Sequence, residues 1–204
     1  MSEHLITDRA GLHRIYPEPK GLAVGKQLSA LDEHCRAFIA RAPFLILGTE
    51  GDVSPKGDGP GFVRVMDEET LLIPDRWGNN RLDSLCNILV DPRVGLLFMI
   101  PGIGETLRVQ GTARITTDPE LLEPMALKGR VPASGIMVHV EEAFFHCAKS
   151  MRRSKLWNPE AQTRRSELTH PGRAMALQGG TGPDAGERSY DEGIEAAMVE
   201  EGRE

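Results

Sequence analysis

Short apolar runs separated by turn residues recur through the middle of the chain and indicate strands rather than long helices. Polar and apolar positions alternate in residues 106–115, with Leu107, Val109, Gly111, Ala113 and Ile115 on one face and Arg108, Gln110, Thr112 and Arg114 on the other. Further strands are predicted at 44–48, 61–66, 70–73, 94–100 and 135–140. Because turn residues separate most of these segments, about six strands joined by hairpins are expected.

Helical spacing interrupts this pattern near residue 30. Apolar positions within 31–39 recur at intervals of three and four residues, which predicts an amphipathic helix. Ser29 is its expected N-cap, Asp32 and Glu33 lie in its first turn, and Pro43 ends it. The helix therefore precedes the first strand.

A second helix is predicted over residues 79–90, with Asn79 or Asn80 as N-cap and Asp91-Pro92 as its end. Its expected apolar stripe consists of Leu82, Leu85, Cys86 and Leu89. A short helix over 118–128 and a basic, mostly helical segment over 143–157 are also expected. Long strand–helix–strand crossovers are scarce, so the predicted fold is mainly β, an antiparallel barrel with peripheral helices.

The chain divides into three regions by composition. Residues 1–28, rich in Gly, Pro and charge, are expected to form an N-terminal arm, and residues 29–158 contain the barrel. Residues 159–204 form a C-terminal extension in which 178–186 resemble a linker and 190–204 are acidic. The acidic end suits either a short helix or disorder, and either a contact with a partner subunit or a solvated tail.

Composition and charge narrow the function classes. The 204 residues are 40% hydrophobic and carry a formal net charge of −6, which argues against a general nucleic-acid binder. No stretch approaches the roughly 18 apolar residues of a membrane span, and the start lacks the apolar core of a signal peptide. Cys35, Cys86 and Cys147 are odd in number and widely spaced, so we expect reduced thiols in a cytoplasmic protein. His139 and His146 lack a spaced carboxylate partner, so no metal site is expected.

Polar residues that suit an anion fall at the end of one strand and at the start of the second helix. Residues 54–58 contain Lys56, and Arg81 and Ser84 lie near the helix start. Free backbone amides and the positive end of the helix dipole favour a phosphate there. Arg81 can add bidentate hydrogen bonds, and Ser84, three residues later, is expected on the same face. The alternative is that Arg81 is a solvated surface arginine and that the asparagines are simple caps.

Several motifs in a fixed order resemble one known family. They are PKG at 55–57, IPDR at 73–76, GNNRLDSL at 78–85, DPRVGLLF at 91–98, LRVQGTA at 107–113 and HCAKSMRRSKLW at 146–157. In this order they resemble the FMN-binding split barrel of the pyridoxamine 5'-phosphate oxidase-like family. The resemblance extends over about residues 30–158 and implies an antiparallel split β-barrel.

The resemblance also implies a homodimer with FMN sites at the subunit interface and an oxidoreductase activity on a small-molecule substrate. Carried over by position, Arg81 and Ser84 would hold the phosphate. The other residues from the same subunit would be Lys56, Arg76, Asn80 and Gln110, with Lys56 near the ring or phosphate and Gln110 near the ring. The second subunit would contribute Lys149, Arg152, Arg153 and Trp157.

Alternatives to these assignments stay open. Arg152, Arg153 and Lys155 could form a solvated helix face, and Trp157 could anchor a core or an interface. Residues for the phosphate of pyridoxamine are not evident in the C-terminal part, so oxidation of vitamin B6 itself is not expected. The rival function class is a flavin- or ligand-binding module without turnover, and related barrels also bind a deazaflavin or haem.

Overall fold

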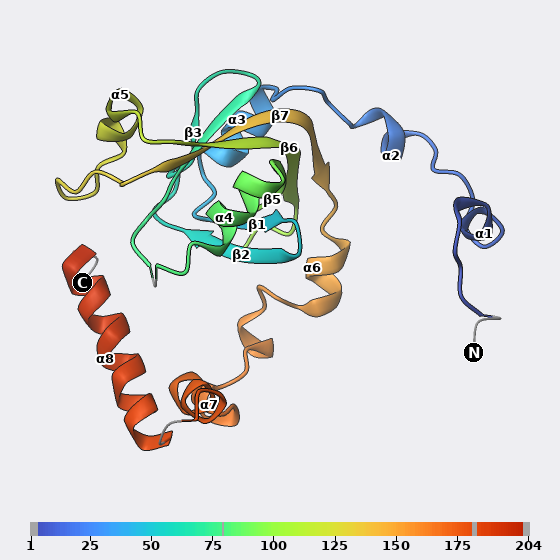
Figure 1. The fold of residues 1–204 in the computed structure, drawn as a ribbon. Helices are drawn as coiled ribbons and strands as arrows, with labels where there is room; N and C mark the ends of the chain where they lie inside the picture. Colours follow the sequence, from blue (N-terminus) through green and yellow to red (C-terminus); the bar gives the residue numbers. More distant parts are fainter. Residues whose placement is uncertain (1–3, 79, 181–182, 202–204) are drawn as a thin grey trace.

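A seven-stranded antiparallel sheet forms the centre of the protein in a computed structural model that describes residues 4–78, 80–180 and 183–201. The strands follow the order β2-β1-β5-β6-β7-β4-β3, and the sheet curves around one apolar core (Figure 1). Their bounds are β1 Phe44–Thr49, β2 Asp52–Gly57, β3 Arg64–Val65, β4 Thr70–Pro74, β5 Arg93–Met99, β6 Thr106–Thr116 and β7 Gly135–His146. The prediction of a mainly β, antiparallel fold with peripheral helices is confirmed.

The helices lie at the periphery and in the two terminal regions. They are α1 Arg9–His13, α2 Leu22–Gly25, α3 Glu33–Ile39, α4 Asp83–Val90, α5 Pro119–Leu122, α6 Lys149–Ser154, α7 Pro171–Gln178 and α8 Pro183–Glu201. Short 3-10 turns occur at Glu123–Met125, Pro159–Ala161 and Arg165–Glu167. Among the helices of the described residues, none combines the length and the hydropathy needed to cross a membrane.

The alternation of apolar and polar residues does not predict the strand β2, because its sequence is polar and contains Pro55. Proline cannot donate to a strand ladder and is therefore confined to edge strands. β2 is such an edge, since among the described residues it pairs with β1 alone, and a tight turn at Gly51 (φ +75°) joins the two strands. The predicted strand at 61–66 is shorter than expected and keeps only Arg64–Val65.

The predicted helix over 143–157 is wrong in its first part, because β7 continues to His146. A β-bulge between Gln110 and Gly111 of β6 shifts the register, so that Val140 pairs with Gly111 and Glu142 pairs with Gln110. The extra residue, Glu141, breaks the period of two along the sequence. Buried positions resume at Ala143, out of step with those before the bulge. The alternation in the sequence therefore does not predict that the strand continues to His146.

Two helix starts also differ from the prediction. The N-cap of α3 is Asp32 rather than Ser29, because the Asp32 carboxylate accepts a hydrogen bond of 2.8 Å from the Cys35 amide. The helix α4 begins at Asp83, so Asn80 is not its N-cap, and Asn79 lies outside the described residues.

The predicted apolar stripe of α4 is confirmed only at Leu85, which packs against the core, and is wrong at its other three positions. Leu82 and Leu89 are 51% and 76% exposed, whereas Ser84 and Ile88 are buried. α4 packs against β1, β2 and β6, and polar contacts help to set its rotation. One of them joins the Asn87 amide to the Thr49 hydroxyl at 3.1 Å.

The N-terminal arm contacts the strand β7, whereas the main contacts of the helices in the C-terminal extension are with each other. At the end of the N-terminal arm Leu28 pairs with Ala143, and the Lys26 ammonium donates to the Phe145 carbonyl at 2.7 Å. In the C-terminal extension α7 and α8 form a helical hairpin that stands apart from the sheet (Figure 1). The acidic end is helical as far as residue 201, and the predicted linker is shorter than expected, since α8 already starts at Pro183.

Candidate functional site

A pocket of about 710 Å³ lies where β2, the loop after β4 and the start of α4 meet, and we call it the α4 pocket. Five residues singled out in the sequence line it, although they come from three separate segments. These residues are Lys56, Arg76, Asn80, Arg81 and Ser84. The structure thus brings together the part of the predicted site that the resemblance assigns to one subunit, except for Gln110.

The strand β2 supplies one wall of the α4 pocket. Along β2, Asp52, Ser54 and Lys56 are half-buried while the residues between them are exposed, as the period of a strand requires. The Ser54 hydroxyl lies 2.8 Å from the Ser84 hydroxyl, which attaches this wall to α4.

The start of α4 presents backbone amides to the same space. Leu82, at the N-cap, adopts a left-handed conformation (φ +59°) and supplies no side-chain cap, and the first-turn residues Asp83, Ser84 and Leu85 line the pocket. Uncapped amides at a helix start, together with the helix dipole, attract an anion. The start of α4 therefore favours an anion in this part of the pocket.

Arg81 precedes α4 instead of lying within it, so the expectation that Arg81 and Ser84 share a helix face is wrong. Its Nε donates to the Asp83 carboxylate at 2.8 Å. This hydrogen bond and the negative charge of Asp83 raise the pKa of the Arg81 guanidinium above its usual value. Both Arg81 and Ser84 still line the α4 pocket, because the chain turns between them.

Arg76 has a structural partner as well as a place in the pocket wall. Its Nε donates to the Asp58 carboxylate at 2.7 Å, and its Nη1 donates to the Met125 carbonyl at 2.8 Å. The Arg76 side chain is 17% exposed and that of Asp58 is 7% exposed, so the pair is largely withdrawn from water. These contacts fix the loop after β4 to the end of β2 and to the turn at Met125.

Asp75, the third residue of the IPDR motif, lines the α4 pocket as well. Burial raises the pKa of its carboxyl group, and the positive charge of Lys56 partly opposes that increase. The Asp75 amide donates to the Ser134 carbonyl at 3.0 Å, which brings the loop before β7 to the pocket. Asp75 is therefore a titratable pocket residue that lies outside the predicted set.

Ser54 and Ser134 are two further pocket residues that were not predicted. A signal for Ser54 existed, because it lies two positions before Lys56 and so shares its side of a strand. Ser134 had no local signal, since it reaches the pocket only through the pairing of β4 with β7.

The other predicted residues lie elsewhere in the chain. The Gln110 amide on β6 donates to the Glu142 carboxylate at 2.6 Å and does not line the α4 pocket. Lys149, Arg152 and Arg153 are on α6, and Trp157 follows that helix. Within one chain these residues do not join the first group.

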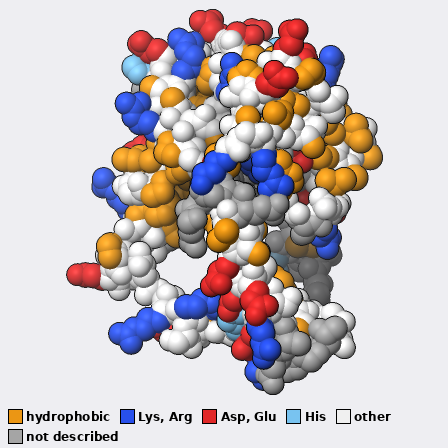
Figure 2. Space-filling model, turned by 90° about the vertical axis from the view of Figure 1, so that its left-hand side faces the viewer, with side chains coloured by type: hydrophobic (Ala, Val, Ile, Leu, Met, Phe, Trp, Pro, Cys, Tyr) orange, Lys and Arg blue, Asp and Glu red, His pale blue; other side chains and the backbone are white. Residues whose placement is uncertain are grey.

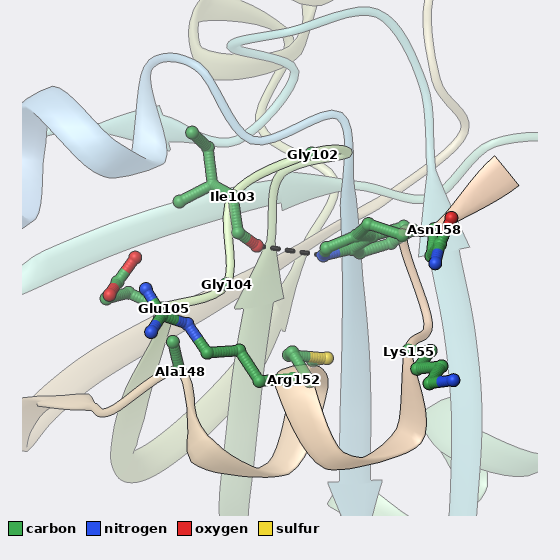
Figure 3. Close-up of a pocket in the computed structure, with 10 residues that line it drawn as sticks. Gly102, Ile103, Gly104, Glu105, Ala148, Arg152, Lys155 and Asn158 are labelled. Carbon is green, nitrogen blue, oxygen red and sulfur yellow. Dashed lines mark hydrogen bonds between the residues drawn. The ribbon is translucent and has the colours of Figure 1, made fainter.

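Arg152 and Trp157 line a second pocket, of about 470 Å³, which we call the α6 pocket (Figure 3). The Trp157 indole donates to the Ile103 carbonyl at 2.8 Å, shown as the dashed line in Figure 3. Ile103, Met151 and Trp157 give this pocket an apolar lining, and Arg152 and Lys155 add positive charge. Lys149 and Arg153 line neither pocket.

The fold and the site define a β-barrel protein with a polar pocket at a helix start. The sequence model of the pyridoxamine 5'-phosphate oxidase family matches residues 31–147, which is more than half of the chain. The chain therefore belongs to the pyridoxamine 5'-phosphate oxidase family. A search of curated proteins found no match.

Several solved structures are similar to this chain. HupZ of Group A Streptococcus is 20% identical over 56% of this chain and 93% of its own, with a TM-score of 0.46. A proposed pyridoxamine 5'-phosphate oxidase of Lactobacillus delbrueckii is 22% identical over 58% and 98%, with a TM-score of 0.45. An FMN-binding protein of Syntrophomonas wolfei is 11% identical over 55% and 83%, with a TM-score of 0.44.

Proposed function

We propose that this chain is an FMN-dependent oxidoreductase that works as a homodimer, with the flavin phosphate at the first turn of α4. The observation that carries the proposal is the meeting of Lys56, Arg81 and Ser84 with an uncapped helix start in one pocket. Family membership supports the choice of a flavin over other phosphorylated ligands.

The donor set suits a phosphate monoester. Such a group accepts charge-assisted hydrogen bonds from arginine and lysine, which are roughly twice as strong as neutral ones. Arg81 and Lys56 supply the cations, and Ser84 and the amides of α4 supply neutral donors. The pocket volume of about 710 Å³ also lies within the range of about 300–1,000 Å³ typical of cofactor sites.

The outer face of the sheet supports a homodimer. Ile46, Leu97 and two glycines form an open apolar depression of about 330 Å³, beside Arg108 and His146. Burial and the nearby charges of Lys26 and Arg108 lower the pKa of His146, so this face tends to carry a neutral imidazole. An apolar face of this kind favours contact with a second subunit. In the proposed dimer, Lys149, Arg152, Arg153 and Trp157 would close the α4 pocket of the partner, and Gln110 would approach the ring.

The residues of this chain would bind, orient and shield the cofactor. Bound FMN would supply hydride or electron transfer, while the protein supplies position and local charge. The raised pKa of Asp75 suits its carboxyl group to hold a proton beside the pocket. Trp77, under the Arg130 guanidinium at 4.5 Å, would help to exclude water on the open side.

The decisive experiment adds FMN to the purified protein and follows flavin absorbance and fluorescence. We expect one FMN per chain and a dimer in sedimentation, with flavin released on denaturation. Colourless protein that does not bind added FMN would reject the proposal. Reduction by NADH or NADPH then tests turnover, and a bound flavin that no donor reduces would identify a binding module instead of an enzyme.

A further inference from the structure

The hairpin of α7 and α8 carries an apolar face that its own chain covers only in part. The two helices approach so closely that a Cβ at Gly172 would collide with the Gly186 carbonyl. The His170 ring packs edge-on against Tyr190 and lies 3.1 Å from the Asp191 carboxylate. These contacts identify the side of α8 that faces α7.

The helix α8 extends well beyond α7. With 8 residues in α7 and 19 in α8, the helices are about 12 Å and 28 Å long. α7 starts next to Asp191, so the part of α8 after that residue passes its end. The apolar side continues there at helical spacing through Ile194, Ala197 and Met198, and Ile194 is 48% exposed.

This extending part of α8 is also strongly acidic. Residues 183–204 contain eight Asp or Glu and two Arg, so they account for the whole formal net charge of −6. Glu187 and Asp191 contact Arg173 and His170 of α7, while Glu192 and Glu195 are exposed. Figure 2 shows acidic side chains on the part of the molecule below the barrel. A surface complementary to this stripe would be an apolar groove flanked by positively charged side chains.

The α6 pocket has these two properties. Its lining includes Ile103, Met151 and Trp157. One carboxylate, Glu105, also lines it, but the segment 143–159 contains four Lys or Arg and no Asp or Glu, so cations outnumber this single acid. Among the described residues, no carboxylate forms an ion pair with Lys149, Arg152, Arg153 or Lys155. Figure 3 shows Arg152 and Lys155 projecting from α6 around the pocket. Figure 1 shows α8 far from α6 of the same chain, with α7 between them.

We propose that residues 190–199 of α8 dock on the α6 pocket of a second copy of this chain. Ile194 and Met198 cover its apolar lining, and Glu192 and Glu195 pair with Lys149 and Lys155. The inference rests on the proposed homodimer. Because α6 is the segment that the partner contributes to the flavin site, the docked helix lies beside that site and restrains the segment that closes it.

Cross-linking between labelled copies tests this contact directly. Unlabelled and ¹⁵N-labelled full-length proteins are mixed until subunits exchange, treated with a zero-length carbodiimide, digested and examined by mass spectrometry. We expect cross-links between Glu192 or Glu195 and Lys149 or Lys155, with light–heavy pairs among them. Cross-links confined to single copies, or none between these segments, would overturn the proposal.

Charge exchange provides the second test, with the dimer dissociation constant from sedimentation as the readout. Glu195→Lys and Lys155→Glu should each weaken the dimer about fivefold at low salt, because a symmetric dimer contains the contact twice and each exposed ion pair is of mid-range strength. The combined variant should return to within about twofold of the native protein, because the two sites then attract again. Glu160→Lys, an equal charge change outside both surfaces, is the control, and equal effects of Glu195→Lys and Glu160→Lys would contradict the pairing.

The same samples separate this inference from the proposed function. A dimer that binds FMN but lacks light–heavy cross-links refutes only the docking of α8. A dimer with these cross-links that does not bind FMN refutes only the flavin site. A monomer refutes the homodimer and, with it, the docking.

Discussion

The hydroxyl groups of Ser54 and Ser84 lie 2.8 Å apart, although 30 residues separate them in the chain. One belongs to the edge strand β2 and the other to the first turn of α4. Ser84 is only 6% exposed, so the hydrogen bond is shielded from water. This contact sets the position of the helix start relative to Lys56, two residues along β2, and thus the spacing of the proposed phosphate donors.

Replacement of Ser84 by Ala should lower the free energy of unfolding by about 0.5–1.5 kcal/mol, the net value of one such hydrogen bond. Ser54→Ala should have a similar effect, and the double variant should lose less than the sum, because both changes remove the same bond. Urea denaturation measures all three. Ser154→Ala, in which an exposed hydroxyl on α6 is removed, serves as the control. Strictly additive losses would show that the two hydroxyls do not interact.

Arg81→Ala should weaken FMN binding by about 1.5–3 kcal/mol, the usual range for hydrogen bonds to a charged group. The affinity follows from fluorescence titration of the flavin. The chain contains a matched control in Arg93, an exposed arginine that pairs with Asp91 two residues away, just as Arg81 pairs with Asp83. Arg93→Ala should leave FMN affinity unchanged. Equal affinities of the two variants would place the phosphate elsewhere.

The sequence predicted the fold where local patterns agreed with the tertiary structure. The alternation in β6 survived intact, with Leu107, Val109 and Ala113 buried on one face. Prediction from the sequence failed where a contact between distant residues determined the local structure. In β7, for example, a bulge against β6 displaces the alternation of buried and exposed residues. The start of α4 was misplaced because Asn80 and Leu82 adopt left-handed conformations that no helix-propensity argument anticipates.

The candidate site was predictable in its residues more than in its geometry. Lys56, Arg81 and Ser84 stand in motifs and could be assigned by position. The burial of Asp75 and its contact with Ser134 depend on the pairing of β4 with β7, which the sequence does not state. Whether Gln110 and the α6 residues join the site depends on a second subunit, so their roles stay predictions.

The raised pKa of Asp75 predicts a specific pH dependence of stability. Folding raises this pKa above its ordinary value of 3.8, so the folded state binds the proton more tightly than the unfolded state. The associated stability is present below that value and is lost as the pH rises through the raised pKa. Asp75→Asn should remove this loss, so that its stability relative to the native protein improves as the pH increases.

Urea midpoints of the native protein and Asp75→Asn, measured from pH 3 to pH 8, test that dependence (about five pH values suffice to define the slope). Asp118→Asn provides a control at an exposed carboxylate. A constant difference between the native protein and Asp75→Asn across the series would show that burial does not perturb Asp75.

Gly111→Ala should destabilise the barrel by roughly 3 kcal/mol or more, at the upper end of the overpacking range. A Cβ at this position would collide with the His139 carbonyl across the bulge between β6 and β7, and backbone cannot move aside as a flexible side chain can. Gly59→Ala is the control, because the space around that position is open. Thermal unfolding of both variants measures the effect, and the melting temperature should fall only for Gly111→Ala. A native-like melting temperature for Gly111→Ala would show that the bulge relaxes freely.

The three cysteines should differ widely in their reaction with iodoacetamide. Burial, together with the neighbouring Asp32, raises the pKa of the Cys35 thiol to about 12, and this side chain is inaccessible in the core. Cys147 is exposed, and the Lys149 amide and the charges of Lys149 and Lys26 lower the pKa of its thiol. Mass spectrometry of the folded protein at about pH 8 should therefore find Cys147 alkylated before Cys86, with Cys35 protected until urea unfolds the chain. Alkylation of Cys35 in the folded protein at the rate of exposed Cys86 would show that α3 opens readily from the barrel.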